Sequence, residues 1–193
     1  MRKVITIASI LLTASCAASA ADAAPVQHRP QKTVQQVTVG RLTGQEQVSA
    51  AKGQNLVASA VAVANQRRIA AVIKQVESRI GKTWYVFSGD QPTGWDCSGL
   101  TRWAYAQLGV DIPHSATKQA GSGRKVTNPQ QGDIVLFGYK GSKSYYHAAL
   151  YVGNGLVVHA GFRRGTTTQL IPILSPAFKS SRITFIRVIN TGS

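Results

Sequence analysis

The sequence predicts an α+β fold, in which helices come first along the chain and an antiparallel sheet follows. Two observations carry this prediction. Up to Gly109 the apolar residues recur mostly at helical spacing. From Asp133 onward they form short runs separated by turn-forming residues, which is typical of strands joined by hairpins. The chain has 193 residues, which is enough for one domain with a full core and additional segments.

The chain begins with the three-part pattern of an export signal, which we assign to residues 1–20. Arg2 and Lys3 are followed by an apolar run and by the small residues 18–20, which fit a cleavage site. Cleavage after residue 23 also fits. The apolar run is shorter than the roughly 20 residues that span a bilayer, so we expect a secreted or cell-envelope protein without a permanent anchor.

Of the two cysteines, only Cys97 is expected to remain in the mature protein. Cys16 lies where a lipoprotein would carry its lipid, but residues 13–15 lack the aliphatic residue of that motif, so we expect no lipid anchor there. Removal of the signal would leave Cys97 alone, and a lone thiol cannot form an internal disulfide. Cys97 is then either a buried apolar side chain or a reactive group.

The chain is strongly basic. Its 22 Lys and Arg residues face 7 Asp and Glu residues, for a formal net charge of +15. Such a charge attracts polyanions. No arginine-rich block or aromatic–basic alternation is present, so we do not expect nucleic acid as a partner. For an exported protein the anionic polymers of a cell wall are the expected partner, and a merely solvated basic surface is the alternative.

Residues 21–66 are predicted to form a spacer followed by an Ala-rich helix. The spacer is rich in Gln, Thr and Val, and apolar residues recur at helical spacing over residues 45–66. Gly53 weakens this helix, and disorder is the alternative. If the helix forms, we expect it to pack on a protein partner or on the domain that follows.

A compact domain, which holds the candidate catalytic residues discussed below, is predicted to cover residues 67–193. A second helical pattern occupies residues 69–80. After a turn-rich loop, a further helix is expected over residues 97–108, with Asp96 as its N-cap and Gly109 as its stop.

The rest of the domain is predicted to be mostly strands. Residues 110–126 are expected to be a loop with a short turn at most. The strands that follow are expected to form an antiparallel meander over residues 133–137, 147–152, 156–160, 169–173 and 183–189.

Cys97 is the strongest candidate for a catalytic residue. It falls in the first turn of the helix that Asp96 caps. There, free backbone N–H groups and the helix dipole favour an anion and would lower the pKa of the thiol. The N–H group of Cys97 or Ser98 would also meet a developing oxyanion. A nearby histidine acting as general base would complete such a site.

Two of the four histidines, His147 and His159, lie on neighbouring strands of one predicted hairpin. If residues 153–155 form a three-residue loop, Ala149 pairs with His159. The two histidines then share a face as diagonal neighbours, roughly 7–8 Å apart at the backbone. A two-residue loop would put them on opposite faces. On a shared face, one histidine takes the proton of Cys97 and the other holds the first in the right tautomer.

Other readings of the histidines stay open at this point. A zinc site made of Cys97, His147 and His159 is one alternative, although no C-x-x-C or H-E-x-x-H pair accompanies it. Unrelated core histidines are another. His114 is a candidate substrate contact, and His28 lies in the spacer with no expected role.

Three stretches resemble the NlpC/P60 family of cell-wall peptidases, and the similarity covers about residues 69–190. The most specific is the run Asp96-Cys97-Ser98-Gly99-Leu100 within residues 85–100. The others are Gln-Gly-Asp-Ile-Val-Leu-Phe at residues 131–137 and the pattern H…Y-x-G-x-G…H-A over residues 147–160. The resemblance implies a papain-like fold, with the nucleophile helix packed on an antiparallel sheet and, here, a helical N-terminal segment before it.

The resemblance also implies a role for particular residues. Cys97 matches the nucleophile, His147 the base and His159 the orienting third member. Tyr85 matches a tyrosine beside the nucleophile, and Asp96 and Ser98 belong to the same substrate and oxyanion region. No metal or cofactor is implied.

The chain departs from the family pattern at three places around the expected cleft. Ser88 stands where glycine is usual, and Ala148-Ala149-Leu150 stands where Val-Gly-Ile is usual. His114 stands where arginine commonly follows Leu-Pro. None of these removes a catalytic group, and all affect the shape of the cleft.

The resulting expectation is an exported bacterial cysteine endopeptidase acting on peptidoglycan. It would hydrolyse stem peptides between γ-D-glutamyl and the diamino acid that follows. Two alternatives remain. One is a non-catalytic envelope scaffold that binds a partner through helix 45–66. The other is a papain-like amidase or acyltransferase acting on another cell-wall amide.

Overall fold

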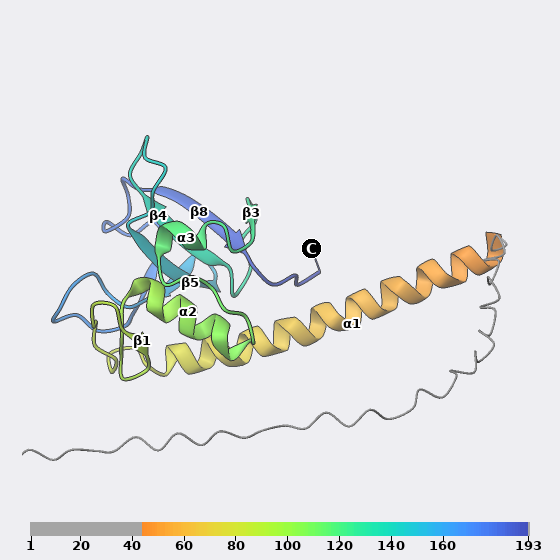
Figure 1. Ribbon diagram of the computed structural model, residues 1–193, viewed down its shortest axis with the longest axis horizontal. Coiled ribbons are helices and arrows are strands. Elements are labelled where there is room, and N and C mark those ends of the chain that lie inside the picture. Colours follow the sequence, from red (N-terminus) through yellow and green to blue (C-terminus); the bar gives the residue numbers. More distant parts are fainter. Residues whose placement is uncertain (1–43, 193) are drawn as a thin grey trace, which may run out of the picture. The chain divides into compact units, whose positions relative to one another are not determined.

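The computed structural model describes residues 44–192, and helices dominate the first half of this range and strands the second (Figure 1). The α+β fold expected from the sequence is confirmed. The predicted export signal and spacer lie outside the described residues. The elements are α1 (Gly44–Glu77), β1 (Asp90–Gln91), β2 (Gly94–Trp95), α2 (Cys97–Gln107), α3 (Ala116–Gln119), β3 (Arg124–Val126), β4 (Ile134–Gly138), β5 (His147–Gly153), β6 (Leu156–His159), β7 (Gln169–Pro172) and β8 (Arg182–Arg187).

α1 is one continuous helix where the sequence pattern predicted two. The residues at the expected junction, 66–68, are good helix formers, so nothing interrupts the backbone hydrogen bonds there. Arg68 ties this region to the domain by donating from Nη2 to the carbonyl oxygen of Leu108 at 2.6 Å. The last turns of α1 supply core residues spaced i, i+3, i+4 and i+7, each at most 5% exposed: Ile69, Val72, Ile73 and Val76.

The first half of α1 is largely exposed. Val48, Leu56 and Val61 are between 54% and 69% exposed. By length and composition alone, the stretch Gln47–Glu77 would suffice to cross a membrane, but the end of that stretch is built into the core of the domain. A protein partner for helix 45–66 stays a prediction.

The main sheet has six antiparallel strands in the order β3-β8-β4-β5-β6-β7. The run β4 to β7 is the expected meander. The last strand, β8, returns to pair with β4 instead of extending the far edge. The other edge of β8 pairs with residues 124–126, which were predicted to lie in a loop. These residues become strand β3 because β8 offers them unpaired backbone groups.

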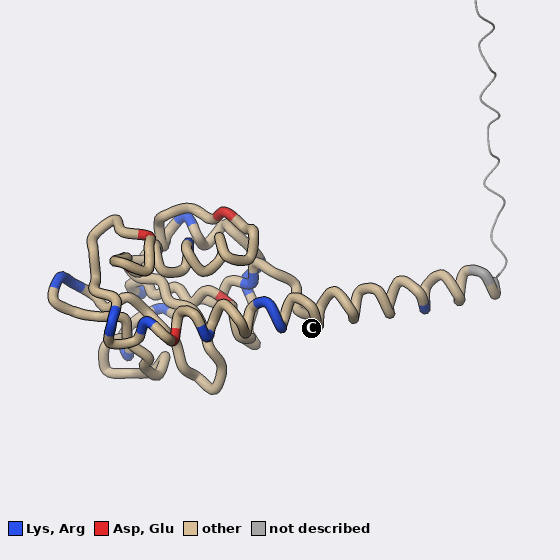
Figure 2. The backbone as a smooth tube through the Cα atoms, turned by 90° about the horizontal axis from the view of Figure 1, so that it is seen from below, with Lys and Arg blue, Asp and Glu red and all other residues tan. Residues whose placement is uncertain are grey.

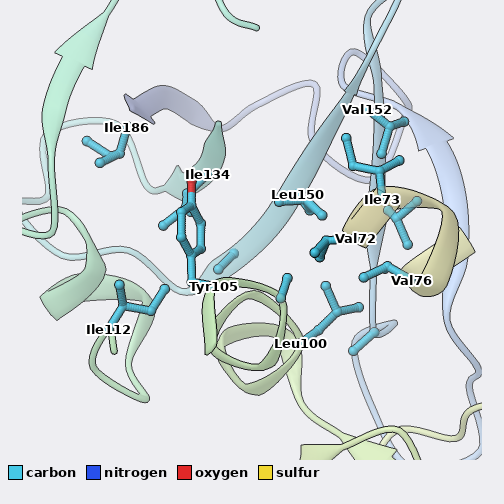
Figure 3. Packing of buried hydrophobic residues seen from close by; sticks show 14 of the residues in the cluster. Val72, Ile73, Val76, Leu100, Tyr105, Ile112, Ile134, Leu150, Val152 and Ile186 are labelled. Carbon is cyan, nitrogen blue, oxygen red and sulfur yellow. The ribbon is translucent and has the colours of Figure 1, made fainter. Parts of the chain in front are cut away.

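The sheet carries apolar side chains on both faces. One face packs against α1 and α2. There, Val72 of α1, Leu100 of α2 and Leu150 of β5 belong to one buried cluster (Figure 3). The other face carries a second cluster that includes Phe137 and Phe178, whose rings stack at 3.6 Å. Because successive residues of a strand alternate in direction, β5 contributes to both clusters.

The loop between α1 and α2 is anchored by Trp95, which is fully buried. Its indole Nε1–H donates to Thr168 Oγ1 at 2.8 Å, just before β7. The backbone N–H of Asp96 donates to the carbonyl oxygen of Gly89 at 2.9 Å. These contacts fix the residues directly before α2, and so they fix where α2 begins.

Candidate active site

The first residue of α2 is Cys97, as predicted. Asp96 is the N-cap, with extended backbone angles, and its Oδ1 accepts from the N–H of Gly99 at 2.7 Å. Gly99 is required at this point because a Cβ there would lie 1.9 Å from the carbonyl oxygen of Gly89. Cys97 is the free cysteine among residues 44–192 and is partly exposed.

The carboxylate of Asp96 joins several polar groups beside Cys97. Oδ1 also accepts from Ser98 Oγ at 3.0 Å and from His114 Nε2 at 2.9 Å. Oδ2 accepts from the N–H of Ser88 at 3.1 Å. Two of the residues that depart from the family pattern, Ser88 and His114, are therefore bonded to the helix cap. The structure places the His114 side chain on Asp96, and a contact of His114 with substrate stays a prediction.

The two histidines of the hairpin are brought together as predicted. His147 Nε2 lies 3.1 Å from His159 Nδ1, and both residues are buried. Leu150 pairs with Val158, and this register puts Ala149 opposite His159.

The prediction of a three-residue loop in this hairpin is wrong. Gly153 pairs with Leu156, which leaves a two-residue turn of Asn154 and Gly155. The pairing shifts by one residue between Tyr151 and Gly153. This bulge offsets the shorter turn, so the histidines still share a face.

Hydrogen bonding at His159 defines the tautomers of the pair. The N–H of Gly161 donates to His159 Nδ1 at 3.2 Å, so that nitrogen carries no proton in the neutral ring. His147 Nε2 must then be the protonated nitrogen that donates to it. The neutral imidazole of His147 is left with an unprotonated Nδ1, which is able to accept a proton.

Burial keeps both histidines neutral. It holds the pKa of His147 well below its usual value, and the neighbouring His159 acts in the same direction. Burial also lowers the pKa of His159 to about 4, against opposing contributions from the Gln169 side chain and the Gly161 amide. A neutral His147 is the form that a general base requires.

The thiol does not follow the sequence-based expectation. Burial raises the pKa of Cys97, and the charge of Asp96 acts in the same direction. Hydrogen bonds from the backbone amides of Ala148, Ser98 and Cys97 itself oppose this rise. The expected lowering by the helix terminus is therefore outweighed. At neutral pH both the thiol of Cys97 and the imidazole of His147 are therefore uncharged.

The amide contact with Ala148 also locates the sulfur. Ala148 follows His147 directly in β5, so Cys97 Sγ lies at the start of the strand that carries the first histidine. Tyr85 lies beside the same group. Burial has the largest effect and raises the pKa of its phenol, and the negative charges of Cys97 and Asp96 raise it further. The structure thus brings together Tyr85, Asp96, Cys97 and Ser98 at the start of α2, and it pairs His147 with His159. The Ala148 amide links the first group to the strand that begins with His147.

Two phenylalanine rings that pack on the histidines were not predicted. The ring of Phe162 stacks on His147 at 4.6 Å and lies 5.0 Å from the ring of His159. Phe178 lies 5.5 Å from His147 and 5.8 Å from His159. Phe162 follows His159 by only three residues, and that spacing is the signal from which it could have been found. Phe178 carries no such signal.

A zinc site would need at least three ligand side chains to converge. Within residues 44–192, no group of three or more His, Cys, Asp or Glu side chains is arranged as a metal site.

Acidification is expected to destabilise the fold through His159. Between pH 6.5 and about 4 the unfolded chain takes up a proton that the folded chain does not, because burial lowers the pKa in the folded state. This contribution to stability is fully present above pH 6.5 and is lost as the pH falls to about 4. It corresponds to about 3 kcal/mol in the free energy of unfolding.

Urea unfolding of the wild type and His159→Gln over this pH range measures that effect. The variant should lose less stability on acidification, with the remaining dependence coming from His147. Equal pH dependence in the two proteins would show that His159 is not held neutral by the fold.

An α+β domain with a cysteine at the start of a helix, packed on an antiparallel sheet that carries two histidines, defines the papain-like class of folds. The model of the NlpC/P60 family matches residues 81–182, and the chain belongs to this family.

Curated relatives agree with this assignment. A probable endopeptidase of Mycobacterium tuberculosis is 35% identical over 105 residues, which are 53% of this chain and 26% of that protein. The bifunctional muramidase/DL-endopeptidase CwlT of Bacillus subtilis is 42% identical over 76 residues, 37% of this chain and 23% of that protein. The chain therefore spans about a quarter of the length of either relative.

Solved structures show the same fold. An NlpC/P60 family protein from Bacillus cereus has a TM-score of 0.54 and 28% identity, covering 58% of this chain and 38% of that one. The NlpC/P60 domain of the peptidoglycan hydrolase SagA has a TM-score of 0.52 and 30% identity, covering 62% of this chain and 98% of that domain.

Proposed function

We propose that the protein is an exported cysteine endopeptidase that hydrolyses peptidoglycan stem peptides at the bond between γ-D-glutamyl and the diamino acid. The observation that carries the proposal is the buried His147–His159 pair with its defined tautomers. The residue directly after His147, Ala148, bonds Cys97 through its amide. The family and the described functions of CwlT and SagA support the substrate class. The signal-like pattern at residues 1–20 supports export.

Acylation begins with proton transfer from the thiol of Cys97 to Nδ1 of His147. The sulfur attacks the carbonyl carbon of the γ-glutamyl group, and the oxyanion that forms is stabilised by N–H groups in the first turn of α2, including that of Ser98. The imidazolium of His147 is stabilised by its Nε2–H bond to His159. It then gives its proton to the leaving amine, the C–N bond breaks, and a thioester remains on Cys97.

Deacylation uses the same groups in the opposite order. Neutral His147 accepts a proton from water, the hydroxyl attacks the thioester carbonyl, and the oxyanion collapses. The proton returns to the sulfur, so the γ-glutamyl acid leaves and the thiol is restored. No metal is needed for this sequence.

Asp96, Ser98 and Tyr85 shape the acyl side of the site. The carboxylate of Asp96 caps α2 and holds the Ser98 hydroxyl, so it positions the first turn around the sulfur. Tyr85 lies close enough to Cys97 and Asp96 for their charges to raise its pKa. We place these three residues around the γ-glutamyl portion of the substrate.

The basic surface is proposed to hold the enzyme near anionic wall polymers. Figure 2 shows Lys and Arg spread over the described domain, with few Asp and Glu between them. Attraction between exposed charges and a polyanion weakens as salt screens it, so binding to isolated wall polymers should fall with ionic strength.

The direct test is to digest defined muropeptides and identify the new termini by mass spectrometry. The proposal predicts a new carboxyl group on γ-D-glutamate and a new amine on the diamino acid. New termini at another cell-wall amide, or transfer of the acyl group to an added amine, would instead indicate the amidase or acyltransferase alternative. Binding of muropeptides without any cleavage would indicate the scaffold.

A further inference from the structure

A pocket of about 540 Å³ lies beside Phe162, the residue whose ring packs on both histidines. Its lining includes Tyr139, Tyr146, Phe162, Lys179 and Ser181. Phe162 belongs to both the pocket and the site, because its ring stacks on His147 at 4.6 Å with an interplanar angle of 29°. Tyr146 is the residue directly before His147. Phe162 and Tyr146 therefore connect the pocket to the buried imidazole.

Three aromatic side chains of the pocket are exposed to solvent, and two of them are held in place by mutual contact and a hydrogen bond. Tyr139 is 68% exposed, Phe162 44% and Tyr146 38%. The rings of Tyr139 and Tyr146 lie 4.7 Å apart, and the Tyr146 hydroxyl is hydrogen-bonded to Ser181 Oγ. Exposed aromatic side chains grouped in a hollow with a few polar groups are typical of ligand sites.

The charge of this part of the chain favours an anionic ligand. Residues 134–193 contain seven Lys and Arg residues and no Asp or Glu. One of the seven, Lys179, lines the pocket and is exposed. A carboxylate entering the pocket would therefore meet a lysine without repulsion from an acidic side chain of this segment.

The mechanism decides which half of the substrate reaches the pocket. His147 must lie within hydrogen-bond reach of the leaving amine to give it a proton. The chain that follows that amine therefore starts beside His147, where the pocket begins. The acyl half lies instead toward Tyr85 and Asp96, which surround the sulfur.

We propose that the pocket binds the leaving half of the substrate, an anionic peptide. Its carboxylate meets Lys179 and its aliphatic portion lies on Tyr139 and Phe162. This inference rests on the proposed peptidase function, since it takes His147 as the proton donor. A stem peptide fits this chemistry, because the portion after the γ-glutamyl bond has free carboxylates and aliphatic side chains.

Three substrates with one γ-D-glutamyl acyl half test the proposal. The first two have the same leaving peptide, ending in a carboxylate or in a carboxamide. The third has 4-nitroaniline as its leaving group and so has no peptide to place in the pocket. Lys179→Gln is expected to lower kcat/KM about fivefold for the carboxylate substrate and to leave the other two nearly unchanged.

Two further variants separate charge from aromatic contact. Tyr139→Ala should lower kcat/KM for both peptide substrates and leave the anilide unchanged. Lys82→Gln is the matched control, because this exposed lysine does not line the pocket, and it should behave as wild type on all three substrates. Equal effects of Lys179→Gln on the carboxylate and carboxamide substrates, or no effect on either, would overturn the proposal.

A binding measurement distinguishes failure of this inference from failure of the proposed function. Calorimetry with Cys97→Ala and the free leaving-half peptide should give a Kd that rises about fivefold when Lys179→Gln is added. If the wild type cleaves none of the substrates while this binding holds, the pocket stands and the peptidase proposal fails. If cleavage occurs and the Kd does not change, the pocket proposal fails alone.

Discussion

Cys97→Ala is expected to reduce muropeptide cleavage by about 10⁴- to 10⁶-fold, to a level that a digest does not detect. In the proposed mechanism the thiol forms the acyl-enzyme, and no other described cysteine can replace it. The fold should survive, because the contacts that position the start of α2 are made by other groups. Asp96 caps the helix through the N–H of Gly99, and Trp95 is anchored by Thr168. Cleavage is measured by chromatography of the muropeptide products, and folding by thermal unfolding.

Cys97→Ser is the matched variant. It changes a single atom, the sulfur to an oxygen, and the resulting hydroxyl is a much weaker acid than the thiol. With a neutral His147 as the only base, we expect it to remain close to the alanine variant in activity. A Cys97→Ala protein that melts like the wild type and cleaves at the wild-type rate would end the peptidase proposal.

His147→Ala is expected to lower kcat by about 10²- to 10⁴-fold, the usual contribution of a general base. The loss should be large because burial raises the pKa of Cys97, so the thiol needs a base to take its proton. His159→Ala should cost less, about 10- to 100-fold, because His159 acts through the orientation of His147.

The positioning role of His159 has its own test. His159→Gln keeps a carbonyl oxygen that is able to accept the Nε2–H of His147, so it should recover part of the kcat that His159→Ala loses, with little change in KM. Because His159 is fully buried, the thermal stability of both variants must be measured alongside. Equal losses of kcat in two folded variants would show that the hydrogen bond to His147 does not matter.

Several parts of the site follow from short-range sequence features. Asp96 is a good N-cap because its carboxylate reaches the N–H three residues on, and Gly109 follows α2 with the positive φ of 79° that favours glycine. Cys97 in the first turn is a consequence of that local chemistry. The shared face of His147 and His159 follows from strand periodicity, although the predicted loop length was wrong and a bulge supplied the missing residue.

Other features depend on residues far apart in the chain. Residues 124–126 become a strand only because β8 lies beside them. Phe178 reaches the histidines from a segment whose local pattern indicates nothing about them. The pocket with Lys179 likewise combines three separate segments of the chain.

The sequence by itself determined the α+β class, the helix that begins at Cys97 and the identity of the paired histidines, because caps, turns and hydrophobic periodicity act over a few residues. Only the tertiary structure decided the protonation chemistry. The helix terminus favours a thiolate, yet burial outweighs it at Cys97 and keeps both histidines neutral. Desolvation depends on every element packed around a group, and for that reason the local sequence did not reveal it.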